Sequence, residues 1–323
     1  MSSLLSVRDL RVDYETPAGP ARAVNGVSFD LARGEFLAVV GESGCGKSTM
    51  LFAIAQLLAY PASQVGGVVT FDGVDLTSLT PEELRRHRWR DFSVVMQSAM
   101  NALNPTMSIG AQLADVCRAH TDWDDARIAQ RCAEVLAMVS IDPAHLKSYP
   151  FQLSGGMRQR AMIAMALLLE PKLVIMDEPT SALDVVAQRS LMRQVQSLRE
   201  QLGFSVLFVT HDMSVVSHFS DRLAVMYAGE VVELGATRAV FDEPRHPYAR
   251  GLMDAFPSLL GERRPLTGIA GNPPSLVDPP RGCLFAPRCA HATDRCRSAR
   301  PALVEADGRA VRCFLVNDEV DDG

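Results

Sequence analysis

Short apolar runs bounded by turn residues alternate with amphipathic stretches along most of the chain. Four of the runs have the length and the β-rich composition of buried strands: 35–41, 92–97, 172–178 and 204–210. The stretch at 47–58, which follows the first of them, has the pattern of a helix. Strands that alternate with helices predict an α/β fold around a largely parallel sheet, with ligand sites at the carboxyl ends of the strands.

The pattern changes between residues 98 and 170, where no strand-like alternation interrupts the helical spacing. Apolar residues recur with that spacing within 124–141, at Ile128, Cys132, Val135 and Val139. We therefore expect an α-helical insert at about 98–170.

A change in composition near residue 236 predicts a domain boundary. Residues 222–235 have the pattern of a hairpin with its turn near Ala228 and Gly229, and after them proline, glycine and arginine become frequent. We expect a main domain at 1–235, which contains the helical insert, and a C-terminal extension at 236–323 with few long apolar runs.

Composition and charge argue against several classes of protein. The net charge of −6 disfavours a chain that wraps nucleic acid, because neutralising phosphates needs a basic face. The longest apolar run, at 161–169, is far shorter than the roughly 20 residues of a membrane-spanning helix. The first residues lack the basic start and apolar segment of a secretory signal, so we expect a cytosolic location, where disulfides are disfavoured.

A phosphate loop is predicted at residues 41–49, GESGCGKST, which match G-x-x-x-x-G-K-[ST] between a predicted strand and a predicted helix. Glycines let backbone N–H groups turn toward a phosphate chain, and the helix N-terminus adds partial positive charge. Lys47 is expected to reach the β- and γ-phosphates and Ser48 to bind Mg²⁺. The predicted nucleotide-binding residues of this loop are Gly41, Glu42, Ser43, Gly44, Cys45, Gly46, Lys47, Ser48 and Thr49.

The segment LVIMDE at 173–178 indicates a nucleotide site independently of the phosphate loop. It is an apolar strand that ends in two acids. Asp177 suits the coordination shell of Mg²⁺, held directly or through water. Glu178 is then placed to orient or deprotonate the attacking water.

The segment LSGGMRQR at 153–160 predicts a second anion-binding element. Ser154 is a good N-cap, and hydroxyl and N–H groups are exposed at Ser154, Gly155 and Gly156 where the helix begins. Because the phosphates of one nucleotide are already assigned to residues 41–48, this element is expected to serve a nucleotide held by another subunit. Taken alone, the segment also fits a capped structural helix.

The order of these motifs resembles that of the nucleotide-binding subunits of ABC transporters. In that family LSGGQ is the signature motif that completes the partner's ATP site, and here Met157 replaces the usual glutamine. The resemblance implies that Tyr14 stacks on adenine, that Gln97 is the Q-loop glutamine sensing Mg²⁺, water and the membrane subunit, and that His211 is the switch histidine at the γ-phosphate. Residues 181–184, SALD, match the D-loop.

The same resemblance implies a P-loop NTPase core with an antiparallel β portion, an α-helical subdomain and a small cysteine-containing extension. The catalytic residues that it implies are Lys47, Gln97, Glu178 and His211, and the Mg²⁺ ligands are Ser48, Gln97 and Asp177. Two ATP molecules are then held between two such chains. Closure of the pair on ATP binding, and its opening after hydrolysis, can drive a membrane partner.

Longer segments resemble the oligopeptide and dipeptide permease group of ABC ATPases. They are SAMNALNPTMSIGAQL at 98–113, HPYARGLMDAFPSL at 246–259, GNPPSL at 271–276 and GCLFAPRC at 282–289. The resemblance implies a peripheral subunit on the cytoplasmic face of the cell membrane. Its implied partners are two transmembrane permeases, a second homologous ATPase as a heterodimer, and an extracytoplasmic substrate-binding protein. Peptides are the expected cargo, with nickel or oligosaccharides as alternatives. Residues 98–113 are expected to contact a cytoplasmic helix of the permease, with a docking loop at 101–105, and an ordinary loop before the helical insert is the alternative.

Non-transport ABC proteins fit the sequence less well. Those acting on ribosomes usually carry two cassettes in one chain, and DNA-repair members insert long coiled coils. This chain has one cassette, no sustained heptads and an acidic balance. A switch protein that binds ATP without hydrolysing it is a further alternative.

Four of the seven cysteines, Cys283, Cys289, Cys296 and Cys313, lie in the extension with the spacing C-x5-C-x6-C-x16-C. Zinc sites usually have ligands in tight pairs, which this spacing lacks. Four thiolates could instead hold a [4Fe–4S] cluster. The resemblance to the peptide-permease group, where similar tails bind iron–sulphur clusters in some members, favours the cluster, and zinc or free, redox-labile thiols are the alternatives.

Five arginines are expected to offset the negative charge of such a site and to lower the pKa values of its thiols: Arg281, Arg288, Arg295, Arg297 and Arg300. A metal there would stabilise a loop-rich tail rather than transfer electrons. The other cysteines, Cys45, Cys117 and Cys132, are predicted to be ordinary buried or loop residues.

Overall fold

The computed structural model describes residues 3–97, 102–181, 183–255 and 268–316. The chain forms two compact units, each assembled from segments that are distant in sequence. Unit 1 comprises Met1–Ser3, Leu31–Phe36 and Ser78–Phe208, and unit 2 comprises Leu4–Asp30, Leu37–Thr77 and Val209–Gly323. The predicted phosphate loop and the C-terminal extension therefore belong to the same unit.

Three adjacent strands form the centre of unit 1, in the order β8-β7-β6. They are β6 (Phe92–Val95), β7 (Leu173–Asp177) and β8 (Ser205–Val209). β6 and β7 run parallel, with Phe92 opposite Leu173 and Val95 opposite Met176. All residues of β7 and β8 are buried, as is typical of strands covered on both faces. These three predicted strands are confirmed.

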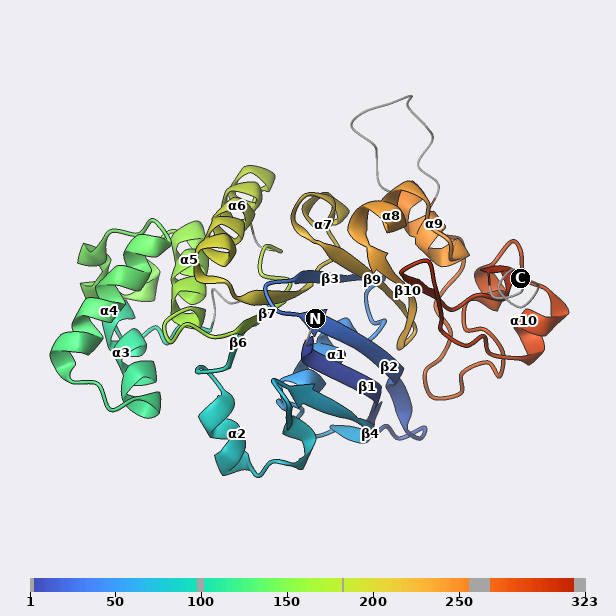
Figure 1. The fold of residues 1–323 in the computed structure, drawn as a ribbon, viewed down its shortest axis with the longest axis horizontal. Helices are drawn as coiled ribbons and strands as arrows, with labels where there is room; N and C mark the ends of the chain where they lie inside the picture. The colour runs from blue at the N-terminus through green and yellow to red at the C-terminus, as the bar shows by residue number, and fades with distance from the viewer. Residues whose placement is uncertain (1–2, 98–101, 182, 256–267, 317–323) are drawn as a thin grey trace. The chain divides into compact units, whose positions relative to one another are not determined.

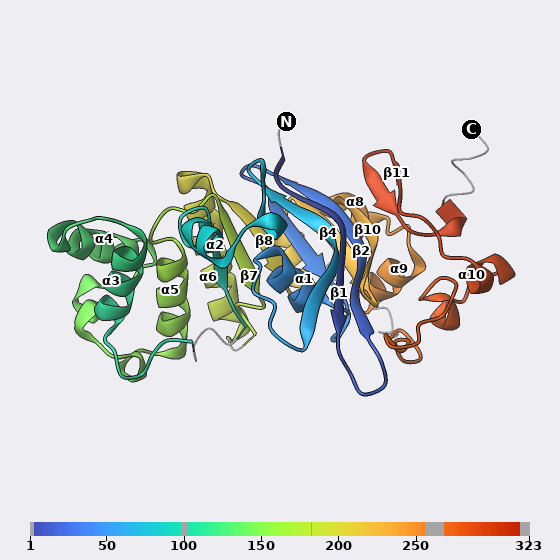
Figure 2. The same ribbon diagram turned by 90° about the horizontal axis from the view of Figure 1, so that it is seen from below.

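Between β6 and β7 the described residues form helices and turns, as predicted. They are α3 (Ile109–His120), α4 (Asp125–Met138), α5 (Gly155–Ala166) and 3₁₀ turns at Pro143–Lys147 and Pro150–Gln152. α4 packs against both α3 and α5 (Figure 1 and Figure 2). It buries Ile128, Cys132 and Val135, whose spacing predicted it.

Two more helices of unit 1 have strong end signals. α2 (Pro81–His87) begins with a capping box between Thr80 and Glu83. α6 (Val185–Leu202) is capped by Asp184 and ends at Gly203, which takes left-handed backbone with a φ of 74°. Within the described ranges, no helix has both the length and the apolar character needed to span a membrane.

Unit 2 contains a four-stranded sheet with the order β2-β1-β4-β5. The strands are β1 (Ser3–Tyr14), β2 (Ala21–Ala32), β4 (Ala62–Phe71) and β5 (Val74–Asp75), followed by a 3₁₀ turn at Leu76–Ser78. β1 and β4 are antiparallel, with Val7 opposite Val69. This sheet is the antiparallel portion that the family resemblance implied.

A second set of strands in unit 2 has the order β11-β12-β10-β9-β3. The strands in sequence order are β3 (Phe36–Val40), β9 (Arg222–Tyr227), β10 (Glu230–Ala236), β11 (Val304–Ala306) and β12 (Arg309–Val311). β3 and β9 are parallel, whereas β9 and β10 form the predicted hairpin. Ala228 and Gly229 both have positive φ, 46° and 85°, as a two-residue hairpin turn of the favoured twist requires.

The helices of unit 2 differ from the sequence prediction in one place. α1 (Lys47–Ile54) ends four residues before the predicted end at 58, because Gln56 takes left-handed backbone with a φ of 52°. The other helices are α7 (Met213–Phe219), α8 (Thr237–Asp242), α9 (Pro247–Asp254), α10 (Asp294–Ser298) and a 3₁₀ turn at Ala286–Arg288. α8 and α9 pack along β10 (Figure 1).

The extension shares a core with the strands of unit 2. Tyr248, Leu284 and Phe285 are buried in one apolar cluster with Val40 of β3 and Val225 of β9. β12 also adds an antiparallel strand to β10. The sequence pattern predicted neither contact, and the apolar cluster places the tail in one core with β3, the strand that leads into the phosphate loop.

Candidate functional site

Glycines set the path of the loop between β3 and α1. Gly41, Gly44 and Gly46 have positive φ, at 156°, 78° and 100°. A Cβ at Gly41 would lie 2.1 Å from the carbonyl oxygen of Met226, and one at Gly46 would lie 2.1 Å from that of Ala23. Only glycine fits at these two positions, because the clashing atoms are backbone atoms.

The N-terminus of α1 has no side-chain cap, because its N-cap residue is Gly46. By contrast, Ser108 and Asp124 cap α3 and α4 with their side-chain oxygens. A helix N-terminus combines partial positive charge with N–H groups that point outward, which is the arrangement that binds phosphate.

Lys47 lies across this loop. Its Nζ donates to the carbonyl oxygen of Gly41 at 2.8 Å and to that of Glu42 at 2.9 Å. The residue is only 6% exposed. The nearby Cys45 thiol is buried, and this burial raises its pKa, so Cys45 stays protonated at neutral pH. The donor set therefore fits a phosphate chain: a fixed ammonium group, glycine backbone and a helix N-terminus.

Gly46→Ala tests the loop geometry. The new Cβ would clash with the carbonyl oxygen of Ala23. Alanine would also have to adopt left-handed backbone, which costs about 1–2 kcal/mol by itself. We expect a lower midpoint of thermal unfolding and a loss of MgADP binding in calorimetry. Gly203→Ala is the matched control, because it imposes the same kind of backbone strain with no atom within 4 Å of the added Cβ. Equal effects of the two substitutions would contradict the prediction.

Tyr14 ends β1 beside the phosphate-loop helix. Its hydroxyl oxygen lies 3.2 Å from Oγ1 of Thr49 on α1. The structure thus brings two of the predicted nucleotide-binding residues together, and the stacking of Tyr14 on adenine stays a prediction.

In unit 1, Gln97 and Glu178 lie together although 81 residues separate them. Nε2 of Gln97 donates to Oε2 of Glu178 at 3.3 Å. Asp177, the last residue of β7, is 1% exposed, whereas Glu178 is half-buried and has a φ of 43°. Such backbone in a non-glycine residue costs about 1–3 kcal/mol and is concentrated at functional sites. The sharp turn after β7 thus separates a buried acid from an accessible one.

α5 begins at the predicted second anion-binding element. Oγ of Ser154 accepts a hydrogen bond from the N–H of Met157 at 3.2 Å, which confirms Ser154 as the N-cap. Met157 contributes through its backbone, so having methionine instead of glutamine leaves the cap intact. A Cβ at Gly156 would meet no atom within 4 Å, so packing inside the chain does not explain this glycine.

His211 lies on the loop between β8 and α7. It is exposed, and the next residue, Asp212, caps α7 by accepting from the N–H of Ser214 at 2.8 Å. Parts of three predicted segments lie outside the described residues: 98–101 of the docking segment, Ala182 of SALD, and 256–259 of the tail segment.

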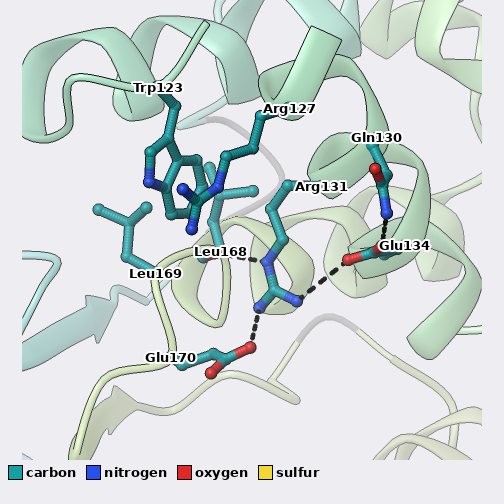
Figure 3. Close-up of a pocket in the computed structure, with 8 residues that line it drawn as sticks. All are labelled: Trp123, Arg127, Gln130, Arg131, Glu134, Leu168, Leu169 and Glu170. Atoms are coloured by element: carbon teal, nitrogen blue, oxygen red, sulfur yellow. Dashed lines mark hydrogen bonds and ion pairs between the residues drawn. The ribbon is translucent and has the colours of Figure 1, made fainter.

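A polar hollow in unit 1 is lined by none of the predicted site residues (Figure 3). Its lining consists of Trp123, Arg127, Gln130, Arg131, Glu134, Leu168, Leu169 and Glu170. The buried Arg131 donates through Nε to the carbonyl oxygen of Leu168 at 2.8 Å and pairs with Glu134 and Glu170. These contacts attach α4 to the segment after α5. We therefore interpret the hollow as a feature of helix packing and not as a ligand site.

The four cysteines of the extension line one cavity. Its other lining residues are His246, Pro247, Phe285, Ala286, His291, Pro301, Phe314 and Leu315. The N–H of Cys283 donates to the carbonyl oxygen of Cys296 at 2.8 Å, which joins two of the segments. All seven cysteines of the chain fall in the described ranges and are free thiols, and Cys45, Cys117 and Cys132 are buried. Among the described residues, no group of three or more His, Cys, Asp or Glu side chains is arranged to hold a metal ion.

The expected lowering of the thiol pKa values by arginine is wrong for three of these cysteines. Burial raises the pKa values of Cys283 and Cys289 above their ordinary value, and it raises that of Cys313 to about 11. The effect of burial on the thiol pKa values exceeds that of the arginine charges, because several of the arginines have other partners.

One of those partners, Phe314, lines the cavity, and the others named here do not. Arg300 pairs with the buried Glu230 at 3.1 Å, and Arg295 stacks on Phe314 at 4.2 Å. Arg297 pairs with Asp294, its neighbour on α10. Arg288 pairs with a residue of the phosphate loop.

Two residues of the extension reach that loop, and no motif predicted either contact. Tyr248 accepts a hydrogen bond from the N–H of Glu42 at 2.9 Å. Arg288 donates to both carboxylate oxygens of Glu42, at 2.8 and 2.9 Å. The contacts join positions 206 and 246 residues apart. The only hint in the sequence is an acid inside a phosphate loop together with the arginine-rich tail.

Two family models match long parts of the chain. The model described as ABC transporter matches residues 24–181, and the oligopeptide/dipeptide transporter C-terminal region matches residues 232–296. A third, described as AAA domain, putative AbiEii toxin, Type IV TA system, matches residues 147–217.

Curated relatives resemble the chain over almost its full length. The oligopeptide transport ATP-binding protein OppD of Escherichia coli is 43% identical over 98% of this chain and 95% of its own. The dipeptide transport ATP-binding protein DppD of Caldanaerobacter subterraneus is 40% identical over 98% of both chains.

A solved structure has the same fold. The dimeric, post-hydrolysis state of the ATP-binding cassette MJ0796 bound to ADP and Pi is 28% identical, with a TM-score of 0.65 over 72% of this chain and 99% of that one. The predicted α/β class and the family resemblance are thus confirmed. The chain belongs to the ABC transporter family, in the group of oligopeptide and dipeptide transport ATP-binding proteins.

Proposed function

We propose that this chain is the ATP-hydrolysing subunit of an ABC importer for oligopeptides or dipeptides. The observation that carries the proposal is the similarity to OppD over 98% of the chain, which spans both the phosphate loop and the extension. The C-terminal match at 232–296 favours peptide cargo over nickel or oligosaccharides. The glycine and lysine geometry of the loop supports nucleotide binding independently.

The proposed roles follow from the chemistry of each side chain. Backbone N–H groups of 41–49 and Nζ of Lys47 bind the phosphates, and Tyr14 stacks on the adenine. Bound MgATP supplies the phosphoanhydride bond whose hydrolysis drives transport. Ser48, Asp177 and Gln97 are the proposed Mg²⁺ ligands.

The remaining catalytic roles concern water and the developing charge. Glu178 orients or deprotonates the attacking water, and the hydrogen bond from Gln97 keeps its Oε2 in a fixed direction. His211 contacts the γ-phosphate. Because phosphoryl transfer asks for little covalent chemistry from the protein, these residues act by positioning and by neutralising charge.

The N-terminus of α5 is proposed to act on a partner subunit's nucleotide. Ser154, Gly155 and Gly156 then contact ATP only when two ATPases are closed together. A ligand that is contacted only in the closed state shifts the equilibrium toward that state. A second homologous ATPase, forming a heterodimer, is the proposed partner.

The remaining proposals concern location and organisation. The chain acts on the cytoplasmic face of the membrane with two permeases and a substrate-binding protein, and residues 98–113 dock on a permease. Residues 1–235 form the nucleotide-binding domain, with its helical subdomain at 98–170, and residues 236–323 form the extension.

Copurification from native membranes tests the assembly. We expect the tagged chain to bring down two multi-span permeases and one homologous ATPase. Recovery of ribosomes or DNA-repair proteins in their place would overturn the transport role. Recovery of the chain alone as a homodimer would overturn the heterodimer.

We also propose that Cys283, Cys289, Cys296 and Cys313 hold a [4Fe–4S] cluster. Convergence of all four thiols on one cavity supports it, because a cluster of this type takes four cysteine ligands. Burial raises the pKa values of Cys283 and Cys313, so a metal would have to displace their protons on binding. The loops would have to rearrange, since no three of these side chains are arranged to hold an ion among the described residues.

The cluster is tested by the metal content of anaerobically purified protein. We expect about four iron atoms per chain with broad visible absorbance, and loss of both in Cys289→Ser. Cys132→Ala is the control, because this buried thiol lies in unit 1, outside the cavity. One zinc ion per chain would support the zinc alternative, and a folded, metal-free protein would support free thiols; either result overturns the cluster.

A further inference from the structure

Every donor nitrogen of Arg288 has an acceptor, and the side chain is only 4% exposed. Nη1 and Nη2 donate to the two carboxylate oxygens of Glu42 in a parallel fork, at 2.8 and 2.9 Å. Nε donates to the carbonyl oxygen of Ala270 at 2.8 Å, and Nη2 also donates to that of Ile269 at 3.0 Å. A charged, bidentate pair of this kind is stronger and more directional than a single hydrogen bond.

Two aromatic rings lie beside the guanidinium group. It lies 5.7 Å from the ring centre of Tyr227 and 5.9 Å from that of Phe285. Tyr227, Tyr248 and Phe285 pack on one another, with ring centres 4.5 to 5.5 Å apart. All three rings belong to the buried core of unit 2, so Arg288 is fixed by packing as well as by hydrogen bonds.

Glu42 is held at three points. Its carboxylate is bound by Arg288, its N–H donates to the hydroxyl of Tyr248 at 2.9 Å, and its carbonyl oxygen accepts from Nζ of Lys47 at 2.9 Å. Two of these three partners come from the extension. The conformation of the loop at its second residue therefore depends on residues beyond position 236.

A carboxylate in a phosphate-binding loop is unfavourable unless it is neutralised. Glu42 immediately follows Gly41, and a negative charge free to turn toward a phosphate chain would repel it over several ångströms. The fork from Arg288 does two things at once. It cancels the charge of Glu42 and it fixes the direction of the side chain.

We propose that Arg288 is a positioning residue of the ATP site, which acts through Glu42 to keep the phosphate loop in its binding conformation and free of repulsive charge. The extension thereby becomes part of the nucleotide-binding apparatus. The inference rests on the proposed role of residues 41–49 as the phosphate-binding loop.

Calorimetric titration of the whole chain with MgADP tests this role. Arg288→Gln leaves the Glu42 charge without its partner, so we expect MgADP to bind about tenfold more weakly. In the double variant Glu42→Gln/Arg288→Gln that charge is gone, and we expect affinity to recover toward the wild-type value. A merely structural role would make the double variant bind no better than Arg288→Gln.

Arg300→Gln is the matched control. Arg300 is likewise an arginine of the extension that pairs with an acid, in this case the buried Glu230 of β10. In the contacts described it touches no residue of the phosphate loop. We expect this variant to lose thermal stability and to keep its MgADP affinity. Wild-type affinity in Arg288→Gln, or equal losses in Arg288→Gln and Arg300→Gln, would overturn the inference. If the wild-type chain itself fails to bind MgADP, the proposed function fails instead.

Discussion

Glu178→Gln is expected to reduce ATP hydrolysis about 10²- to 10⁴-fold while MgATP still binds, because the amide cannot accept the proton of the attacking water. The substitution conserves shape, and the amide oxygen can still accept the hydrogen bond that Gln97 donates at 3.3 Å. The variant should therefore keep its affinity for MgATP and lose most of its hydrolysis. Phosphate release by the assembled complex, together with nucleotide titration, measures the two effects.

Glu170→Gln is the control for this variant. Glu170 is also a glutamate with left-handed backbone, with a φ of 52°, and it pairs with Arg131 in the polar hollow of unit 1. We expect it to hydrolyse ATP at the wild-type rate. Undiminished hydrolysis in Glu178→Gln would show that another group activates the water.

Lys47→Ala is expected to weaken nucleotide binding directly. A hydrogen bond to a charged group contributes about 1.5–3 kcal/mol, so the dissociation constant for MgATP should rise about 10- to 100-fold. The loop should also loosen, since Lys47 joins the carbonyl groups of Gly41 and Glu42. Equilibrium titration of the variant with MgATP measures the effect.

Lys172→Ala separates this effect from a general loss of positive charge. Lys172 is exposed and pairs with Asp91 in unit 1, so its removal should leave the affinity for MgATP unchanged. An affinity of Lys47→Ala within twofold of the wild type would contradict the role given to the loop.

Local patterns predicted the elements that surround the site. The strands that became β3, β6, β7 and β8 follow from short apolar runs, and the hairpin turn at Ala228 and Gly229 follows from its composition. Such signals are local, because periodicity and turn chemistry act over a few residues. The end of α1 was predicted too late, since left-handed backbone at Gln56 leaves no mark in the apolar pattern.

Contacts between distant segments could not be predicted in the same way. β12 forms a local hairpin with β11, but its pairing with β10 joins segments that are distant in sequence. The arginines of the extension were assigned to a metal site, whereas Arg288 and Arg300 reach Glu42 and Glu230. Ion pairs of this kind depend on the fold that brings the partners together, which residue spacing does not encode.

Peptide uptake by reconstituted proteoliposomes tests the central claim most directly. The vesicles hold this chain with its copurified permeases and partner ATPase, and the substrate-binding protein is added with a labelled tripeptide. We predict accumulation of the peptide that requires MgATP and that disappears with Glu178→Gln. Uptake that persists with Glu178→Gln, or ATP hydrolysis that does not respond to the peptide-loaded binding protein, would contradict the account.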